Sequence, residues 1–320
     1  MTDARASSWA IAAGLASIYL IWGSTYVAIR FAIESLPGFL MAGARFVVAG
    51  ALLYAWARWR GAPRPRLVEW RWATAIGALL LTVGNGGVVW AERSVPSGLA
   101  ALLIATVPLW MVVLESLSPG GRRAGPQVWI GLGLGLAGLA LLFGPGALTG
   151  GGSVAPAGAV VLVAASVAWS YGSLLTRRAK LPESALLAAA MQMLAGGALL
   201  ALAGTAAGEW GSFDPAAVTL RSWVSLAYLS VFGSIIAFTA YIWLLQVTSA
   251  TLVSTYAFVN PVIAVLLGWA LAGEALNGRI ALAAAVIIAG VVVITTARGA
   301  RESAHGDRPS DIATEAQRSP

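Results

Sequence analysis

The fold of this chain is decided by residues 9–31, which read WAIAAGLASIYLIWGSTYVAIRF. A helix that crosses the hydrocarbon core of a bilayer needs about 20 mostly apolar residues. This run has 23 residues, whereas the apolar core of a secretory signal peptide spans only about 7–15. The run therefore predicts a membrane-spanning helix rather than a signal peptide that is cleaved.

The rest of the chain has the same character. Of its 320 residues, 59% are apolar and 10% are charged, and the mean hydropathy is +0.81. A soluble domain carries about 25% charged residues, so a soluble enzyme, a nucleic-acid-binding protein and a disordered protein are nearly excluded. None of the apolar runs alternates with the period of two that is typical of barrel strands. We predict an all-α integral membrane protein with ten transmembrane helices, near residues 9–31, 38–58, 72–91, 97–116, 127–144, 155–176, 184–205, 222–244, 248–271 and 279–297.

The basic residues are distributed unevenly over the predicted loops. Fifteen of the 20 fall on one side of the membrane: Arg5, Arg58, Arg60, Arg64, Arg66, Arg71, Arg122, Arg123, Arg177, Arg178, Lys180, Arg298, Arg301, Arg308 and Arg318. Four fall on the other side: Arg30, Arg93, Arg221 and Arg279. Because positive residues are retained in cytoplasmic loops, both termini are predicted to be cytoplasmic. The net charge of +7 is then explained by basic residues in cytoplasmic loops, and it does not indicate a nucleic-acid partner.

The second half of the chain resembles the first. Pairs that match at offsets of 147 to 153 residues are Trp22 and Trp169, Gly50–Leu53 and Gly197–Leu200, Trp90 and Trp243, and Pro108 and Pro261. Each copy holds five predicted spans, and because five is odd the second copy enters the membrane from the opposite side. Such inverted repeats are typical of transporters that bind substrate near the midplane, between the two halves.

The predicted organisation therefore has five parts. They are a cytoplasmic N-terminus at 1–8, a first repeat at 9–144, a linker at 145–154, a second repeat at 155–297 and a polar, disordered, cytoplasmic tail at 298–320. Small residues also predict close packing of the fifth and tenth helices, with each other or with a second protomer. These small residues are Gly131, Gly135, Ala281, Ala285 and Ala289.

Aromatic and amide side chains stand out inside the predicted spans. Trp22 and Trp169 fall near the middles of the first and sixth helices, where an indole N–H needs a partner. Asn85 and Asn260 are amides within apolar runs, where a polar side chain binds a ligand or bonds to a neighbouring helix. We predict that these four side chains line a substrate cavity, with packing as the alternative for each.

Further candidates surround them. Tyr171, Tyr241 and Tyr256 could add aromatic walls with hydroxyl tips, and Thr106 lies two residues before Pro108; packing explains each of them as well. Pro108 and Pro261 each remove one backbone hydrogen bond, so they are predicted to kink their helices. The run GNGG at 84–87 is predicted to weaken the third helix.

Ionisable side chains are rare within the spans. Arg45 is the only cation well inside one, so it needs a partner or water. Glu34 and Glu92, at the outer ends of the first and third helices, are the candidate partners, and an anionic group of the substrate is the alternative. Glu115, near the cytoplasmic end of the fourth helix, is interpreted as a boundary residue, with gating as the alternative.

No metal or cofactor is predicted. The chain has no Cys, and its single His305 lies in the polar tail. No carboxylate or His falls near the midplane, so the ligands and carboxylate pairs of a membrane-embedded enzyme are not visible. For the same reason downhill efflux or exchange is a simpler expectation than proton-driven antiport.

Four strings resemble a known family by their order and spacing. They are IWGST at 21–25, ARF at 44–46, TVPL at 106–109 and VNPV at 259–262. Together with the repeat they resemble the EamA family of the drug/metabolite transporter superfamily, over about residues 9–297. GNG at 84–86 and VPSG at 95–98 further resemble its bacterial drug/metabolite exporter branch.

The resemblance implies ten helices in inverted five-helix repeats around a central cavity lined by helices 1, 3, 4, 6, 8 and 9. It also implies export of amino acids or other small metabolites. Trp22 and Trp169 match two aromatic cavity positions of the family's aromatic-amino-acid exporters. Asn85 falls on the cavity position of the third helix, and Thr106 falls near that of the fourth.

We therefore expect a multi-pass exporter in the bacterial inner membrane that moves metabolites, such as amino acids or amphiphilic compounds, by alternating access. The expected partners are the lipid bilayer and a small-molecule substrate, without nucleic acid, and the protein is expected to be a monomer or homodimer. The alternatives are a sugar or nucleotide-sugar exchanger and, more weakly, a membrane-embedded enzyme.

Overall fold

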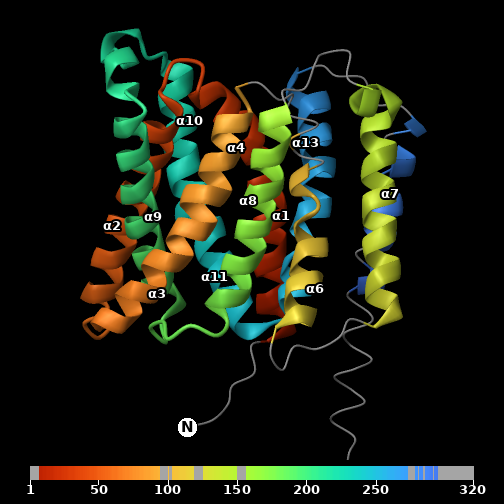
Figure 1. Cartoon of the computed structure of the whole chain (residues 1–320), viewed down its shortest axis with the longest axis horizontal. Coiled ribbons are helices and arrows are strands. Elements are labelled where there is room, and N and C mark those ends of the chain that lie inside the picture. The colour runs from red at the N-terminus through yellow and green to blue at the C-terminus, as the bar shows by residue number, and fades with distance from the viewer. Residues whose placement is uncertain are drawn as a thin grey trace, which may run out of the picture.

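A computed structural model describes residues 7–93, 100, 103–118, 125–149, 156–272, 278–279, 281–283, 285–290 and 292–294. Every regular element in these ranges is a helix, which confirms that the described part of the chain is all-helical. Figure 1 shows the helices standing side by side with their axes roughly parallel. The predicted tail at 298–320 and part of the predicted linker at 145–154 lie outside the described residues.

The helices follow one another in two series. The first consists of α1 (Ser8–Ala32), α2 (Gly38–Trp59), α3 (Leu67–Gly77), η1 (Ala78–Asn85), α4 (Gly86–Ala91), α6 (Val107–Leu117) and α7 (Pro126–Thr149). The second consists of α8 (Pro156–Thr176), α9 (Ala185–Ala206), η2 (Glu209–Ser212), η3 (Pro215–Ala217), α10 (Leu220–Tyr228), η4 (Leu229–Phe238), α11 (Thr239–Val247), α12 (Ala250–Val253) and α13 (Tyr256–Ala272). Residues 281–283, 285–290 and 292–294 are also helical.

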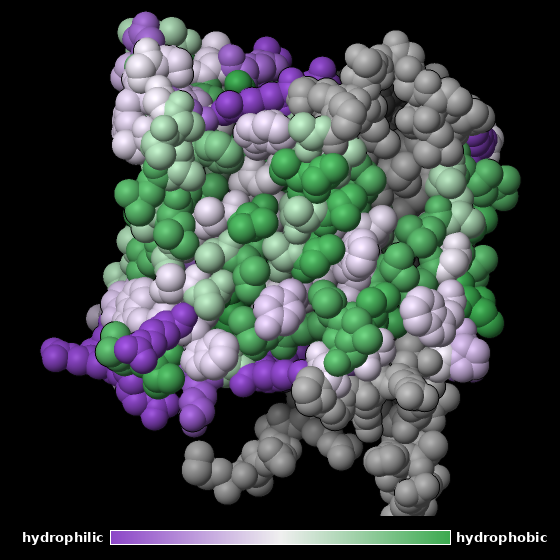
Figure 2. All heavy atoms as spheres, viewed as in Figure 1, coloured by the Kyte–Doolittle hydropathy of each residue, from purple (hydrophilic) through white to green (hydrophobic). Residues whose placement is uncertain are grey.

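Six of the described helices are long and apolar enough to cross a membrane. They are Ser8–Ala32, Gly38–Trp59, Leu67–Ala91, Ala157–Thr176, Ala185–Ala206 and Leu220–Val247. Figure 2 shows a broad apolar surface across the middle of one face, with polar residues at both ends. The other four predicted spans fall on α6, on α7, on α12 with α13, and on residues 281–294. Some of these helices are short and others continue into undescribed residues, so the count of ten remains a prediction.

Short polar side chains define several helix starts. The hydroxyl oxygens of Ser7, Ser184, Thr219 and Ser249 accept hydrogen bonds from backbone N–H groups in the first turns of α1, α9, α10 and α12, at 3.2 to 3.3 Å. Each bond satisfies one of the N–H groups that a helix leaves without an internal partner.

Glycines allow α2 and α9 to pack with their backbones close together. A Cβ atom at Gly43 would lie 2.8 Å from the backbone nitrogen of Ala201, and one at Gly197 would lie 2.9 Å from that of Val47. Helix α7 contacts residues 285–290 in the same way, because a Cβ atom at Gly131 would lie 2.9 Å from the carbonyl oxygen of Gly290. The predicted packing of the fifth helix on the tenth is confirmed. Close approach of this kind is typical of helices in membranes.

Two of the long helices change their hydrogen-bonding register midway. Residues Ala78–Asn85 and Leu229–Phe238 are π-helical, each between two α-helical segments. The helix continues through the run at 84–87 to Ala91, and its π-helical register ends within that run, at Asn85. The predicted weakening of the third helix therefore does not break it.

The two prolines also differ in their effect. A turn at residues 105–106 separates the short helical segment at 103–104 from α6, and Pro108 lies in the first turn of α6. It therefore begins a helix instead of kinking one. Pro261 lies inside α13 and the helix continues through it, so the kink there remains a prediction.

Candidate functional site

One cavity lies between the two series of helices. Its volume, measured as the space open to the centres of water molecules, is about 80 Å³, which is room for several waters. The lining comes from α1, α2, η1, α4, α8, η4 and α13, together with Ile104 just before α6 and Val107 at its start. The lining side chains used below are Trp22, Thr25, Tyr26, Arg45, Phe46, Asn85, Trp169, Phe238, Tyr256 and Asn260.

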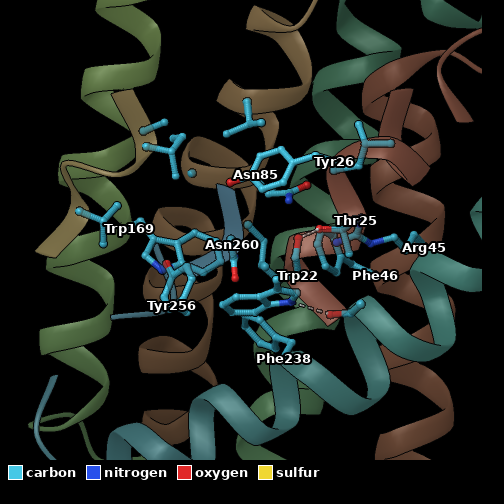
Figure 3. A pocket seen from close by; sticks show the side chains of 18 residues that line it. Trp22, Thr25, Tyr26, Arg45, Phe46, Asn85, Trp169, Phe238, Tyr256 and Asn260 are labelled. Carbon is cyan, nitrogen blue, oxygen red and sulfur yellow. Dashed lines mark hydrogen bonds between the residues drawn. The ribbon is translucent and has the colours of Figure 1, made fainter. Parts of the chain in front are cut away.

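The two predicted tryptophans meet in this cavity. The ring centroids of Trp22 and Trp169 are 5.7 Å apart in an edge-to-face arrangement. Trp22 also contacts Tyr241 and Tyr256, each with a centroid distance of 5.0 Å. Its Nε1 donates to the carbonyl oxygen of Gly233 in η4 at 3.1 Å, the bond drawn in Figure 3. Four segments distant in the sequence thus build one aromatic cluster.

Tyr241 belongs to this cluster and is fully buried. Its hydroxyl accepts from Trp169 Nε1 at 2.8 Å and lies 2.5 Å from Ser173 Oγ. Nearby, Tyr19 Oη lies 2.5 Å from Thr255 Oγ1. The bonds of Tyr241 join α8 to α11, and the bond of Tyr19 joins α1 to the turn before α13.

The two predicted amides differ in their bonding. Both line the cavity. With its amide oriented to satisfy both atoms, Asn260 donates from its nitrogen to the carbonyl oxygens of Tyr19 and Tyr256, at 3.1 and 3.0 Å. Asn260 therefore bonds α13 to α1, in keeping with the packing alternative. Asn85 Oδ1 is buried and accepts no hydrogen bond from the described residues, so it is the amide with capacity for a ligand.

Arg45 lies on the opposite side of the cavity from Trp169 and Tyr256 (Figure 3). The residue is 4% exposed. Its Nε donates to Ser234 Oγ at 2.9 Å, and its guanidinium carbon lies 4.2 Å from the centroid of the Phe46 ring. The predicted ion pair with Glu34 or Glu92 is wrong for the described residues, because neither carboxylate lies within 4.0 Å of this guanidinium.

The predicted glutamates lie at the ends of the bundle. Glu34 pairs with Arg221 at 3.0 Å, and Glu115 pairs with Arg177 at 3.5 Å. The second pair connects the ends of α6 and α8. Glu92 follows α4 directly, and its Oε1 is buried with no hydrogen-bond partner in the described part of the chain. None of the three lines the cavity.

Three predicted binding residues do not line the cavity: Tyr241, which lies in the aromatic cluster, Tyr171 and Thr106. Tyr171 is 50% exposed on the outside of α8, because its neighbour Ser170 takes the inward-facing position and donates to the Val107 carbonyl oxygen. Thr106 donates to the Leu103 carbonyl oxygen at 2.6 Å and accepts from Trp110 Nε1 at 3.2 Å. Its neighbours Ile104 and Val107 line the cavity in its place.

Sequence reasoning missed several cavity residues. Thr25 and Tyr26 lie three and four residues after Trp22, and this helical spacing places them on the same face. That spacing was a usable signal. Phe46 and Phe238 carried none, since an apolar residue in an apolar helix gives no indication of which way it points.

Glu209 was also missed. Its carboxylate accepts from the backbone N–H of Leu40 at 2.9 Å, in the first turn of α2, and pairs with Arg93 at 2.5 Å. A carboxylate at a helix N-terminus is favourable, but the loop sequence around Glu209 does not show that it reaches α2.

Comparison with known proteins identifies the family. The sequence profile of the EamA-like transporter family matches residues 8–144 and 156–296. The chain belongs to this family. The resemblance found from the four sequence strings is confirmed, and the general role of an EamA-like protein is that of a membrane transporter.

Similar proteins include one that is a transporter by name. The chain is 43% identical over 282 residues to the uncharacterized inner membrane transporter YedA of Escherichia coli (strain K12), covering 88% of this chain and 89% of that protein. It is 27% identical to a chloroplastic WAT1-related protein of Arabidopsis thaliana, and the match covers 89% of this chain and 69% of that protein. A solved crystal structure aligns with a TM-score of 0.73 at 27% identity, over 91% of this EamA-like chain and 98% of the other.

Proposed function

We propose that this EamA-like chain is a bacterial inner-membrane exporter of small, partly apolar metabolites that works by alternating access. The observation that carries the proposal is the cavity between the two series of helices. Trp22 comes from the first series and Trp169 from the second, and the two rings contact each other in its wall. A site between two helical repeats is exposed to one side and then to the other when one repeat rocks against the other.

The proposal includes ten spans in two inverted repeats, and several observations support this organisation. The family profile matches the chain in two separate segments. When 147 is added to the residue numbers of α2, 38–59, the result is 185–206, which are the bounds of α9. An offset of 153 carries the π-helical residues 78–85 onto 231–238, within the second π-helical segment.

We further propose that both termini are cytoplasmic, on the strength of the 15 basic residues predicted on that side. In this orientation α1 runs outward, so Thr25 and Tyr26 lie on the outer side of Trp22, and Tyr19 lies on the inner side. The cavity then faces the exterior, and the bonds of Tyr241 and Tyr19 form the inner barrier. Opening toward the cytoplasm requires these hydrogen bonds to break.

The proposal is tested by export from cells. The chain is overexpressed in a bacterial strain lacking its own close relative, and small metabolites in the medium are compared by mass spectrometry. We expect at least one small, partly apolar metabolite to accumulate with the wild type. The double variant Trp22→Ala with Trp169→Ala should abolish that accumulation at equal expression.

The matched control replaces a tryptophan outside the cavity. Trp59 is 81% exposed at the end of α2, so Trp59→Ala should leave accumulation unchanged. If the double cavity variant exported as well as the wild type, the proposed cavity would be refuted. If the wild type changed no metabolite in the medium, export itself would be refuted.

A further inference from the structure

Arg45 is a buried cation on the wall of the cavity without a carboxylate partner in the described residues. The four ion pairs of that part of the chain involve other groups. An unpaired charge inside a membrane protein is costly, and a guanidinium remains charged under nearly all conditions. Such a residue marks a functional position more often than a packing position.

The guanidinium is oriented and has donors to spare. Ser234 accepts from Nε at 2.9 Å and the Phe46 ring lies on one face, so the plane of the group is defined. Nη1 is buried, and no described residue accepts a hydrogen bond from it. A guanidinium presents five N–H donors in a planar fork, which matches the two oxygens of a carboxylate.

The remaining walls suit a molecule with an apolar body. Across the cavity from Arg45 lie the rings of Trp169 and Tyr256, with Trp22 between them and Arg45 (Figure 3). Asn85 Oδ1 is a buried acceptor that no described residue satisfies. The volume of about 80 Å³ restricts the occupant to a small molecule.

From this arrangement we infer that the substrate is a small organic monocarboxylate with an apolar or aromatic body. Its carboxylate pairs with Arg45, its body lies against Trp22 and Trp169, and an N–H or O–H donor reaches Asn85 Oδ1. This inference rests on the proposed function and adds to it the chemical class of the substrate and the residue that selects it.

The test is a matched series of three ligands that share one phenyl group and a three-carbon chain. They are 3-phenylpropanoate, L-phenylalanine and 3-phenylpropanamide. Their binding is measured on the purified full chain in detergent, by the concentration dependence of its thermal unfolding temperature. We expect the wild type to bind at least one of the two carboxylates about 10–100-fold more tightly than the amide, the range of a charge-assisted hydrogen bond.

In Arg45→Gln the preference for carboxylate over amide should disappear, while binding of the amide should change less than threefold. Arg64→Gln, at an exposed position of the loop before α3, should keep the preference. An equal loss of both ligands would mean that Arg45 only supports the structure, and would overturn the inference. A wild type without preference for a carboxylate would overturn it too.

Two further results keep the test decisive. If Arg45→Gln fails to fold, Arg45→Lys retains the charge but loses the planar fork, and it should weaken carboxylate binding severalfold with the amide unaffected. Between the two carboxylates, tighter binding of L-phenylalanine identifies the group at Asn85 as an ammonium. Because binding is measured without transport, a protein that binds 3-phenylpropanoate but exports nothing would refute the proposed function and leave the Arg45 assignment intact.

Discussion

At the scale of single residues, hydrogen-bonding capacity separates the groups of the cavity by role. Asn260 bonds to two carbonyl oxygens and connects α1 to α13. Asn85 and Arg45 keep unused capacity toward the cavity, within the described residues. The hydroxyl of Tyr241 forms hydrogen bonds with Trp169 and Ser173. The same two amides that looked alike in the sequence therefore have different roles, because a neighbouring helix supplies partners to only one of them.

Replacing the Tyr241 hydroxyl tests the inner barrier. Tyr241→Phe removes the acceptor of Trp169 Nε1 and one of the two partners of Ser173 Oγ. We therefore expect a loss of about 1–3 kcal/mol in stability, read as a lower unfolding temperature of the purified protein. Tyr171→Phe is the matched control, because Tyr171 is half exposed on the outside of α8, and it should leave the unfolding temperature unchanged. Equal shifts for both variants would contradict a barrier held by Tyr241.

Glu92 predicts a dependence of stability on pH. Burial raises the pKa of this carboxyl to about 7 from its ordinary 4.5, against a smaller opposite effect of Arg30. The folded protein therefore keeps a proton that the unfolded chain releases, so this group lowers the stability progressively as the pH rises from about 4.5 to about 7. Glu92→Gln cannot ionise, and we expect it to raise the unfolding temperature at pH 8 while leaving it unchanged at pH 4.

Glu34→Gln is the control for this comparison, since Glu34 is exposed beside Arg221. Because this variant keeps Glu92, its unfolding temperature should fall between pH 5 and pH 8 as that of the wild type does. A Glu92→Gln variant whose unfolding temperature fell in parallel with that of the wild type between pH 5 and pH 8 would contradict the assignment.

At the scale of the helices, close packing and changes of register place the cavity. Helices α2 and α9 pack through glycines, so their backbones come together without side chains between them. The π-helical segments lie beside the cavity, where Gly84, Asn85, Gly233 and Phe238 contribute to its wall. Segments of this kind occur frequently at functional sites. No apolar periodicity marks them, because the whole helix around each of them is apolar.

The glycine contact predicts opposite effects for one substitution at two positions. Gly43→Ala places a Cβ atom 2.8 Å from the backbone nitrogen of Ala201, so it should destabilise the protein by about 1–3 kcal/mol through overpacking. Gly133→Ala in α7 meets nothing within 4 Å, and there we expect a gain of about 0.4–1 kcal/mol. Unfolding temperatures that shift in the same direction for the two variants would rule out the close packing of α2 on α9.

At the scale of the whole molecule, the charged residues complement the apolar surface. The described helices carry a broad apolar surface between two polar ends (Figure 2), as a protein embedded in a bilayer requires. The ion pairs between distant segments lie at the helix ends and not in the middle, as with Glu34 and Arg221 or Glu115 and Arg177. Arg45 is the cation that departs from this arrangement within the described part of the chain.

The proposed orientation is tested with single cysteines, since the natural chain has none. Arg64→Cys lies in the basic loop before α3, and Ala216→Cys lies in η3, between α9 and α10; both positions are exposed. In intact cells a membrane-impermeant maleimide should label the second variant and not the first, whereas both should react after permeabilisation. Labelling of Arg64→Cys alone in intact cells would reverse the orientation.

The sequence by itself determined that this chain is a helical membrane protein of the EamA-like family, because long apolar runs and short motifs are local features of a chain. It also pointed to Trp22, Trp169, Asn85 and Arg45 as unusual, since polar or amphipathic groups are costly inside apolar helices. Only the tertiary structure decided which of the predicted residues share the cavity. A helix that is apolar on every side has no face marked as inward. Only the packing of the helices therefore shows that Tyr171 points outward, that Glu34 pairs with Arg221 and that Arg45 has no carboxylate partner among the described residues.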